Sequence, residues 1–247
     1  MCGIVGYVGD KPACDVLIEG LKRLEYRGYD SAGVCVQAAG GLLVCKRPGR
    51  IAALCEALDQ APGIRTGTFG IAHTRWATHG EPTEANAHPH FDQDGQIAVV
   101  HNGIIENHAT LKRYLEEQGH VFRSETDTEV LAHLVGSFYD DGAVSLVEAV
   151  RSALREVTGT YGLAVMAAAE PGTLVVARKG SPLIIGAGAD EYVVASDAAA
   201  ILAHTANVVY LDDNEVAVIT PAGLRTSTLD NVPVSKQTEQ IEWSLEQ

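Results

Sequence analysis

The predicted helices of this chain are grouped together rather than inserted after every strand. Apolar residues recur at helical spacing in three consecutive segments, at 106–117, 127–139 and 144–157, and earlier at 14–24 and 51–58. Short apolar runs typical of strands lie before the three-helix block and again from 163 to 226. A doubly wound parallel sheet would need a helix after almost every strand. The pattern therefore predicts an α+β fold with two mostly antiparallel sheets and helices packed outside.

Composition narrows the class of protein. The 247 residues are enough for one large domain or two small ones, and the net charge of −14 argues against nucleic acid or an anionic membrane as a partner. The longest apolar runs are far too short to span a bilayer, and no secretory signal opens the chain. The five cysteines all lie in the first quarter, without C-x-x-C spacing. This favours a reducing, cytoplasmic setting over a disulfide framework or a structural zinc site.

The N-terminal segment offers a possible nucleophile. Cys2 follows Met1, and removal of Met1 would give one residue that carries both a thiol and a free α-amine. That amine has a pKa of about 7.7–8.0 and the thiol one of about 8.5, so the residue could supply nucleophile and base, relayed by a water. The structural alternative is that Cys2 only opens a buried strand at 4–8. Gly3 slightly favours the chemical interpretation, because glycine allows a ligand or strand to approach closely.

Three polar segments could meet at such a nucleophile. Arg75, near the end of a predicted strand at 68–76, could bind a carboxylate through two parallel hydrogen bonds, although such an arginine is more often a surface ion-pair residue. Asn102 and Gly103 form a predicted turn whose N–H groups could stabilise an oxyanion. Asp127 could accept hydrogen bonds from an ammonium group, or simply complement a helix N-terminus. Each signal is weak alone.

The histidines raise the question of a metal site. They are dense at positions 73, 79, 88, 90 and 101, but their spacing matches no zinc pattern such as H-E-x-x-H, and the cysteines do not join them. We therefore predict no metal. The other groups are chemically coherent together, as a thiol nucleophile, an oxyanion hole, a carboxylate site and an ammonium site. A substrate with an α-carboxylate, an α-ammonium and a scissile amide is L-glutamine.

Six segments carry a resemblance to a known family. They are 2–6, 24–33, 73–80, 86–90, 101–107 and 124–129. In the same order, they resemble the glutaminase (glutamine amidotransferase type 2) domains of the glucosamine-6-phosphate synthase family, the glutamine–fructose-6-phosphate aminotransferases. Glutamine phosphoribosylpyrophosphate amidotransferases and asparagine synthetases share the N-terminal cysteine but differ from the sequences seen here at 25–30 and 75–79.

The resemblance implies a four-layer αββα fold of the N-terminal-nucleophile (Ntn) hydrolase class. It implies that Cys2 attacks the glutamine side-chain amide, with its own α-amine as base. Asn102 and the Gly103 N–H would form the oxyanion hole, Arg75 would bind the α-carboxylate, and Asp127 would bind the α-ammonium group. No metal or organic cofactor is implied.

Four further residues enter through the resemblance alone. Trp76, Thr78 and His79 would line the substrate pocket, and Arg27 would order the site around the N-terminus. The family continues into a sugar-isomerase region that converts fructose-6-phosphate and ammonia into glucosamine-6-phosphate, and its full-length members are expected to be homodimers.

The domain boundaries and two alternatives complete the expectations. Residues 2–220 are predicted to be the glutaminase domain, and residues 221–247 a C-terminal strand and linker toward the absent isomerase region. The last dozen residues are polar, and no partner element is predicted for them. One alternative is a non-catalytic glutamine-sensing module, which a retained Met1 would favour. The other is a different amidotransferase, or a peptidase, of the same fold.

Overall fold

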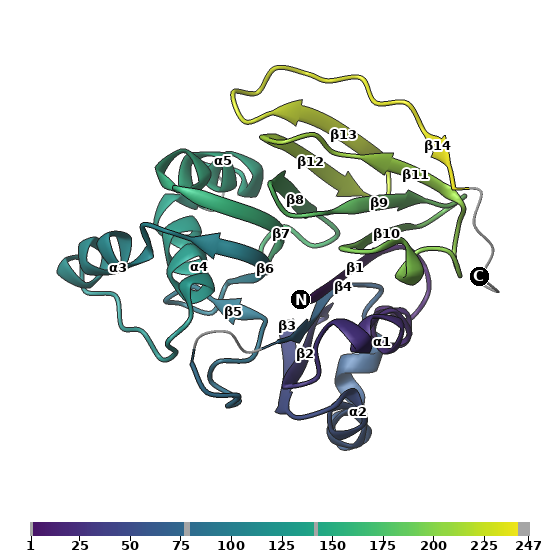
Figure 1. Cartoon of the computed structure of the whole chain (residues 1–247), viewed down its shortest axis with the longest axis horizontal. Coiled ribbons are helices and arrows are strands. Elements are labelled where there is room, and N and C mark those ends of the chain that lie inside the picture. The colour runs from purple at the N-terminus through teal and green to yellow at the C-terminus, as the bar shows by residue number, and fades with distance from the viewer. Residues whose placement is uncertain (1, 77–79, 141–142, 242–247) are drawn as a thin grey trace.

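Two β-sheets face each other at the centre of the molecule (Figure 1). The computed structural model describes residues 2–76, 80–140 and 143–241. Among these residues the first sheet contains, in spatial order, β14 (Glu239–Gln240), β11 (Asn207–Tyr210), β9 (Ile184–Ala187), β10 (Tyr192–Ala195), β1 (Gly3–Val8), β4 (Phe69–Arg75), β2 (Ser31–Ala38) and β3 (Gly41–Pro48). The second contains β13 (Gly223–Thr228), β12 (Glu215–Thr220), β8 (Leu174–Lys179), β7 (Gly159–Ala167), β6 (Ile97–Ile105) and β5 (His90–Phe91). Within the described ranges, neighbouring strands in both sheets pair antiparallel.

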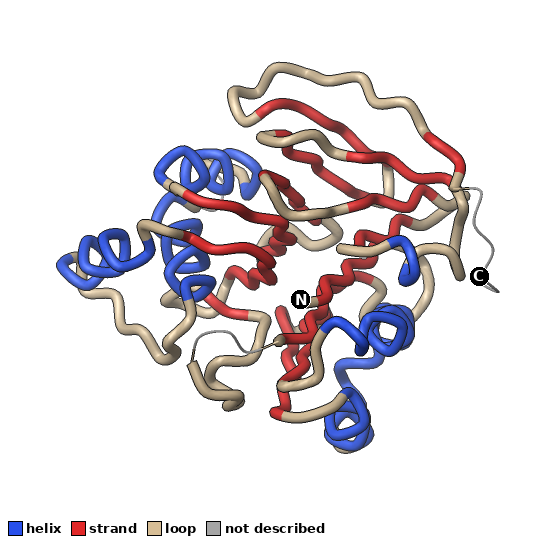
Figure 2. The backbone as a smooth tube through the Cα atoms, viewed as in Figure 1, coloured by secondary structure: helices blue, strands red, loops and turns tan. Residues whose placement is uncertain are grey.

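Helices cover the outer faces of the sheets, as Figure 2 shows. The first sheet carries α1 (Ala13–Leu24) and α2 (Ile51–Asp59), and the second carries α3 (His108–Glu117), α4 (Asp127–Phe138) and α5 (Leu146–Glu156). Short 3₁₀ helices lie at η1 (Glu25–Arg27), η2 (Pro62–Thr66) and η3 (Ala198–Ala200). No helix in the described part of the chain is both long and apolar enough to cross a membrane.

Three apolar cores separate four layers. Because successive strand side chains point to opposite faces, each central strand contributes to two cores. In β1, Val5 belongs to the core between the first sheet and its helices, whereas Ile4 faces the second sheet. In β7, Val165 belongs to the core between the second sheet and its helices, whereas Ala164 faces the first sheet. The helix–sheet–sheet–helix order expected from the sequence is therefore confirmed.

Two local expectations were wrong. Asn102 and Gly103 do not form a turn, because β6 continues through them and pairs them with Gly162 and Tyr161 of β7. The polar C-terminal residues were expected to have no partner element, but β14 pairs with β11. In both places a long-range strand pairing overrides a local preference.

The same alternation brings polar groups to one end of the space between the sheets. In β4, Ile71 lies in the core between the sheets, so His73 and Arg75 follow it on the same face at steps of two residues. β1 runs antiparallel to β4 and pairs Gly3 with Thr74, which places Cys2 beside the end of β4. Figure 1 shows this N-terminal end of β1 in the middle of the molecule.

Candidate active site

Cys2 lies at the junction of β1 and β4. The backbone N–H of Trp76 donates to Cys2 Sγ at 3.3 Å, and the thiol donates to the Trp76 carbonyl at 3.7 Å. Burial raises the pKa of the Cys2 thiol, although the Trp76 N–H and the nearby Arg75 cation oppose that rise. At neutral pH the thiol is therefore protonated at rest. Its use as a nucleophile requires a base.

The side chain of Asn102 points from β6 to the same place. Its Nδ2 donates to the carbonyl oxygen of Cys2 at 3.0 Å, and its Oδ1 lies 2.9 Å from Nε2 of His73. Gly103 follows with φ +130°, a conformation that other residues rarely adopt, and a Cβ there would lie 2.2 Å from the Thr160 carbonyl oxygen. The glycine is therefore required both by the backbone conformation and by the close approach of β7.

Asp127 and Arg75 bring opposite charges to the cavity. Asp127 is the first residue of α4, and its Oδ2 accepts a hydrogen bond from the Ile105 N–H at 2.8 Å, which ties the helix N-terminus to the end of β6. Arg75 is 5% exposed, and its guanidinium donates to the carbonyls of Glu81 and Gly80 at 3.2 and 3.4 Å. The loop around residues 80–81 thus helps to orient the cation.

The start of α4 carries the sequence pattern of a capping box, Thr126-x-x-Glu129, and the structure forms one half of it. Thr126 Oγ1 accepts from the Glu129 N–H at 3.3 Å. The Glu129 carboxylate does not return to Thr126, as it would in a complete capping box. Instead it accepts from the backbone N–H groups of Arg123 and Ser124 at 2.8 and 2.7 Å. It therefore also holds the segment that leads into the helix.

These groups surround a cavity of about 210 Å³. Its described lining consists of Cys2, Arg75, Trp76, His88, His101, Asn102, Gly103, Ile104, His108, Glu125, Thr126, Asp127 and Thr128. Ligand pockets are commonly about 300–1,000 Å³, so this one suits a ligand of amino-acid size. Segments far apart in the sequence thus bring a thiol, an amide donor, a guanidinium and a carboxylate to one small space.

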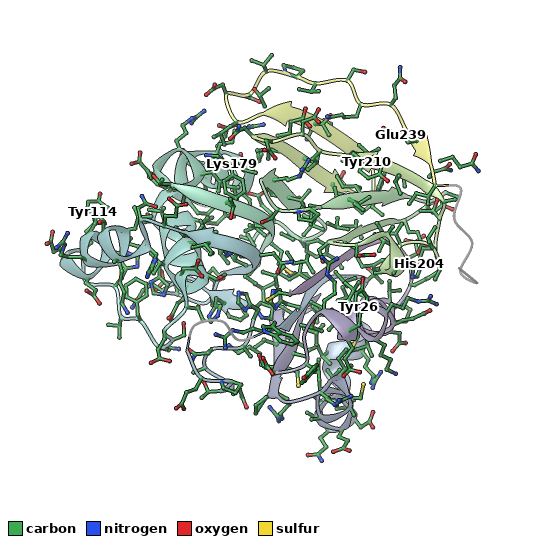
Figure 3. The ribbon with its side chains drawn as sticks, viewed as in Figure 1. Tyr26, Tyr114, Lys179, His204, Tyr210 and Glu239 are labelled. Carbon is green, nitrogen blue, oxygen red and sulfur yellow. The ribbon has the colours of Figure 1, made fainter. Side chains whose placement is uncertain are left out.

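Arg27 lies away from this cavity. Its Nη1 donates to Asp197 Oδ2 at 2.8 Å and to the Ser196 carbonyl at 3.2 Å, and Ser196 Oγ in turn accepts from the Ile4 N–H at 3.0 Å. Tyr26 donates to the same Asp197 oxygen at 2.9 Å, and Figure 3 labels it close to α1. Arg27 is therefore linked to the start of β1 through Ser196, and it is not among the described residues that line the cavity.

Trp76 lines the cavity but is 43% exposed, with an edge-on contact to Tyr29 at 5.6 Å between ring centres. The predicted pocket residues Thr78 and His79 lie outside the described residues. For these two positions the expectation from the sequence is unchanged.

The site also contains residues that the sequence did not assign. Thr128 Oγ1 lies 2.8 Å from His88 Nε2 and 3.0 Å from His101 Nδ1, so one hydroxyl links two buried rings at the cavity wall. Burial lowers the pKa of both histidines, which are therefore neutral near pH 7. The density of histidines and the polar segment 124–129 were the sequence signals that could have indicated these residues.

Within the described ranges, no group of three or more His, Cys, Asp or Glu residues is placed to hold a metal ion.

Comparison with known proteins identifies related sequences and structures. The model of the glutamine amidotransferase domain family matches residues 73–203, which is just over half of the chain. Glutamine–fructose-6-phosphate aminotransferase [isomerizing] of Chlorobaculum tepidum is 51% identical over 248 aligned residues, and that of Thermus thermophilus is 50% identical over 246. Each alignment covers all of this chain but 40% of the relative. The chain thus spans about two fifths of the length of these relatives.

A solved structure shares the architecture. Glutamine phosphoribosylpyrophosphate amidotransferase from B. subtilis superposes with a TM-score of 0.77 at 28% identity, covering 92% of this chain and 49% of that one. The fold is thus that of the N-terminal-nucleophile amidotransferases. With the family model, these likenesses place the sequence among known domains. The chain belongs to the family of glutamine amidotransferase domains.

Proposed function

We propose that this chain hydrolyses the side-chain amide of L-glutamine to glutamate and ammonia. The observation that carries the proposal is that Cys2, Asn102, Arg75 and Asp127 line one cavity of amino-acid size. A thiol beside an amide donor suits attack on a carbonyl carbon. A buried cation and a carboxylate in the same cavity suit the two charged groups of a free amino acid.

The roles follow from the chemistry of each group. Cys2 Sγ forms a bond to the amide carbon, and the carbonyl oxygen becomes an oxyanion that the Asn102 Nδ2–H and the Gly103 N–H stabilise. The carbon–nitrogen bond then breaks, and ammonia leaves with the proton taken from the thiol. A γ-glutamyl thioester remains. Water attacks that thioester, glutamate departs, and the thiol regains its proton.

The base in this scheme is the α-amine that Cys2 gains when Met1 is removed. The raised pKa of the Cys2 thiol makes such a base necessary, because little thiolate exists at neutral pH without one. An α-amine has a pKa of about 7.7–8.0, so it exchanges protons readily near neutral pH. A retained Met1 would convert that amine into an amide and leave the thiol without its base.

The charged residues that line the cavity select the substrate. Arg75 binds the α-carboxylate with a planar fork of N–H donors. Asp127 accepts from the α-ammonium group, while Trp76, Thr78 and His79 complete the pocket. Arg27 contributes by holding the start of β1 through Ser196. The site needs neither a metal nor an organic cofactor for these steps.

The role in the full-length protein follows from the relatives. Those relatives are named as isomerising aminotransferases of fructose-6-phosphate, and this chain corresponds to 40% of their length. We infer that residues 2–220 form the glutaminase domain and that residues 221–247 lead toward a sugar-isomerase region. The ammonia would be passed to that region to form glucosamine-6-phosphate, in a cytoplasmic homodimer.

The test is glutamate release from L-glutamine by the purified chain, with the intact mass of the same sample recorded. We expect release from protein that lacks Met1 and none from Cys2→Ala. Calorimetric titration should show that Cys2→Ala still binds L-glutamine. Binding without turnover by correctly processed, folded wild-type protein would instead support a glutamine-sensing module. Neither binding nor turnover would refute the substrate assignment.

A further inference from the structure

Asn102 has two chemically different ends, and only one of them can stabilise an oxyanion. Its Nδ2 carries two hydrogens, whereas its Oδ1 only accepts. The Cys2 carbonyl oxygen, 3.0 Å from Nδ2, is also an acceptor only. The nitrogen must therefore face Cys2, with one hydrogen on that carbonyl and the other available to a bound substrate. Oδ1 is left facing His73.

His73 must then be the donor to Asn102. Burial lowers the pKa of this ring to about 3, so it is neutral at physiological pH and carries a single N–H. Because Oδ1 of Asn102 accepts, the proton is assigned to Nε2, which lies 2.9 Å away. A reversed Asn102 amide would set its oxygen against the Cys2 carbonyl and its N–H₂ against the His73 donor. The pair thus admits one arrangement.

The ring of His73 is itself held from several sides. It is 1% exposed, and its backbone pairs with Ile4 of β1 and Gly33 of β2. The ring of His88 stacks on it, with centres 4.1 Å apart and planes at 24°. A Cβ at Gly33 would lie 2.1 Å from the His88 carbonyl oxygen, so the absent side chain is what lets the loop that carries His88 approach β2.

We propose that His73 is a positioning residue for the oxyanion hole, which orients the Asn102 amide without touching glutamine. The inference rests on the proposed glutaminase function, in which Asn102 donates to the oxyanion. His73 is not among the described residues that line the cavity. The χ2 torsion of asparagine is broad and has no strong preference of its own, so an outside partner is needed to fix the amide plane.

The first experiment is steady-state glutaminase kinetics on a double-mutant cycle. His73→Leu removes the donor, and we expect kcat to fall about 10- to 100-fold with little change in KM, less than the ~10²–10³ of losing the oxyanion donor itself. In the Asn102→Ala background, the same substitution should have almost no further effect on kcat. His73→Gln keeps an N–H donor and should recover most of the activity.

The matched control is His133→Leu. His133 is also a buried histidine, 2% exposed, but its ring lies near His120 and Glu129 rather than Asn102. Its loss should lower stability and leave kcat per folded molecule unchanged. A wild-type kcat in His73→Leu, or an equal fall in both Asn102 backgrounds, would overturn the proposal.

A second measurement does not depend on turnover. In protein labelled with ¹⁵N-asparagine, the Asn102 side-chain NH₂ signal is assigned by its absence in Asn102→Ala. We expect His73→Gln to keep the wild-type proton shifts of that group, and His73→Leu to move both shifts or broaden them because the amide plane is no longer fixed. If His73→Leu does not fold, His73→Asn, whose amide is too short to reach, takes its place. Unchanged shifts in both would refute the positioning role.

These measurements separate the inference from the function on which it rests. Absence of glutamate release by processed wild-type protein would contradict the glutaminase proposal, while the Asn102 signal would still decide whether His73 orients the amide. Release with a slow Asn102→Ala and a normal His73→Leu would overturn the positioning role alone.

Discussion

The space between the two sheets has an apolar centre and a polar end, and both are buried to a similar degree. Ile71, Val176 and Ile219 at the centre are fully buried, and His73 and Arg75 at the end are at most 5% exposed. The centre stabilises the fold by removing apolar surface from water, at about 25 cal/mol per Å². The end instead buries polar groups, which cost free energy unless each finds a partner.

Both regions are built from successive positions on the same strand faces. The same face of β4 supplies Ile71 to the apolar core and Arg75 to the cavity. The same face of β6 supplies Val100 to the core and, two residues later, Asn102 to the cavity. Folding is thus stabilised by one half of each face, and the other half is available for chemistry. Substitutions in the two halves should therefore have separable effects.

The largest difference between the effect on activity and the effect on stability is expected for Asn102→Ala. If this side chain donates to the oxyanion, kcat should fall by about 10²–10³-fold. The midpoint of urea unfolding should fall moderately, because the substitution leaves the buried His73 N–H without its acceptor, at a cost of about 1–3 kcal/mol. Glutamate-release kinetics measure the first quantity and circular dichroism the second. A change confined to KM would remove Asn102 from the oxyanion hole.

Arg75→Lys tests the polar end through binding. Lysine keeps the charge but cannot form two parallel hydrogen bonds to a carboxylate. Loss of one charge-assisted bond, worth about 1.5–3 kcal/mol, should raise KM for glutamine about 10- to 100-fold with a smaller effect on kcat. Arg65→Lys, at a surface ion pair with Asp15 and Asp59, is the control and should leave KM unchanged. An unaltered KM in Arg75→Lys would contradict the carboxylate role.

Val176→Ala tests the apolar centre. Val176 is fully buried on β8 between the sheets. Two buried methyl groups at about 0.8 kcal/mol each, with a cavity cost in addition, predict a loss of about 2 kcal/mol in the free energy of unfolding. The kcat per folded molecule should stay at the wild-type value. Val232→Ala makes the same chemical change at an exposed position and should be nearly neutral, so equal losses in the two variants would contradict the comparison.

The free energy of unfolding should decrease at acid pH because of the buried histidines at the polar end. Burial lowers the pKa of His73 to about 3, and the pKa values of His88, His90 and His101 are lowered as well, against about 6.5 in the unfolded chain. Between these values the unfolded state binds more protons, so stability falls as pH drops below about 6.5. Each such histidine contributes up to about 1.4 kcal/mol per pH unit.

Urea unfolding between pH 7 and pH 5 measures this dependence. His73→Gln should reduce the slope of the free energy of unfolding against pH by about the contribution of one histidine, because glutamine does not titrate. An unchanged slope in that variant would mean that His73 is not held neutral by the fold.

Much of the site could be predicted because its signals are local. The strand predicted at 68–76 corresponds to β4, and Thr126 caps α4 as its spacing to Glu129 indicates. The Asn102–Gly103 pair was misplaced in a turn, since a dipeptide carries no information about its partner strand. Gly103 does have a positive φ, but it lies inside β6, where the absence of a side chain allows the close approach of Thr160.

The sequence by itself determined the chemical groups, the strand and helix periods and the order of the motifs, because each depends on residues close together in the chain. The tertiary structure decided which of these groups meet. It paired Gly3 with Thr74 and Asn102 with Gly162, set Asn102 against both Cys2 and His73, and left Arg27 behind the strand rather than in the cavity. The physical reason is that pairing and burial join residues distant in sequence, so the neighbours of a side chain depend on the whole fold.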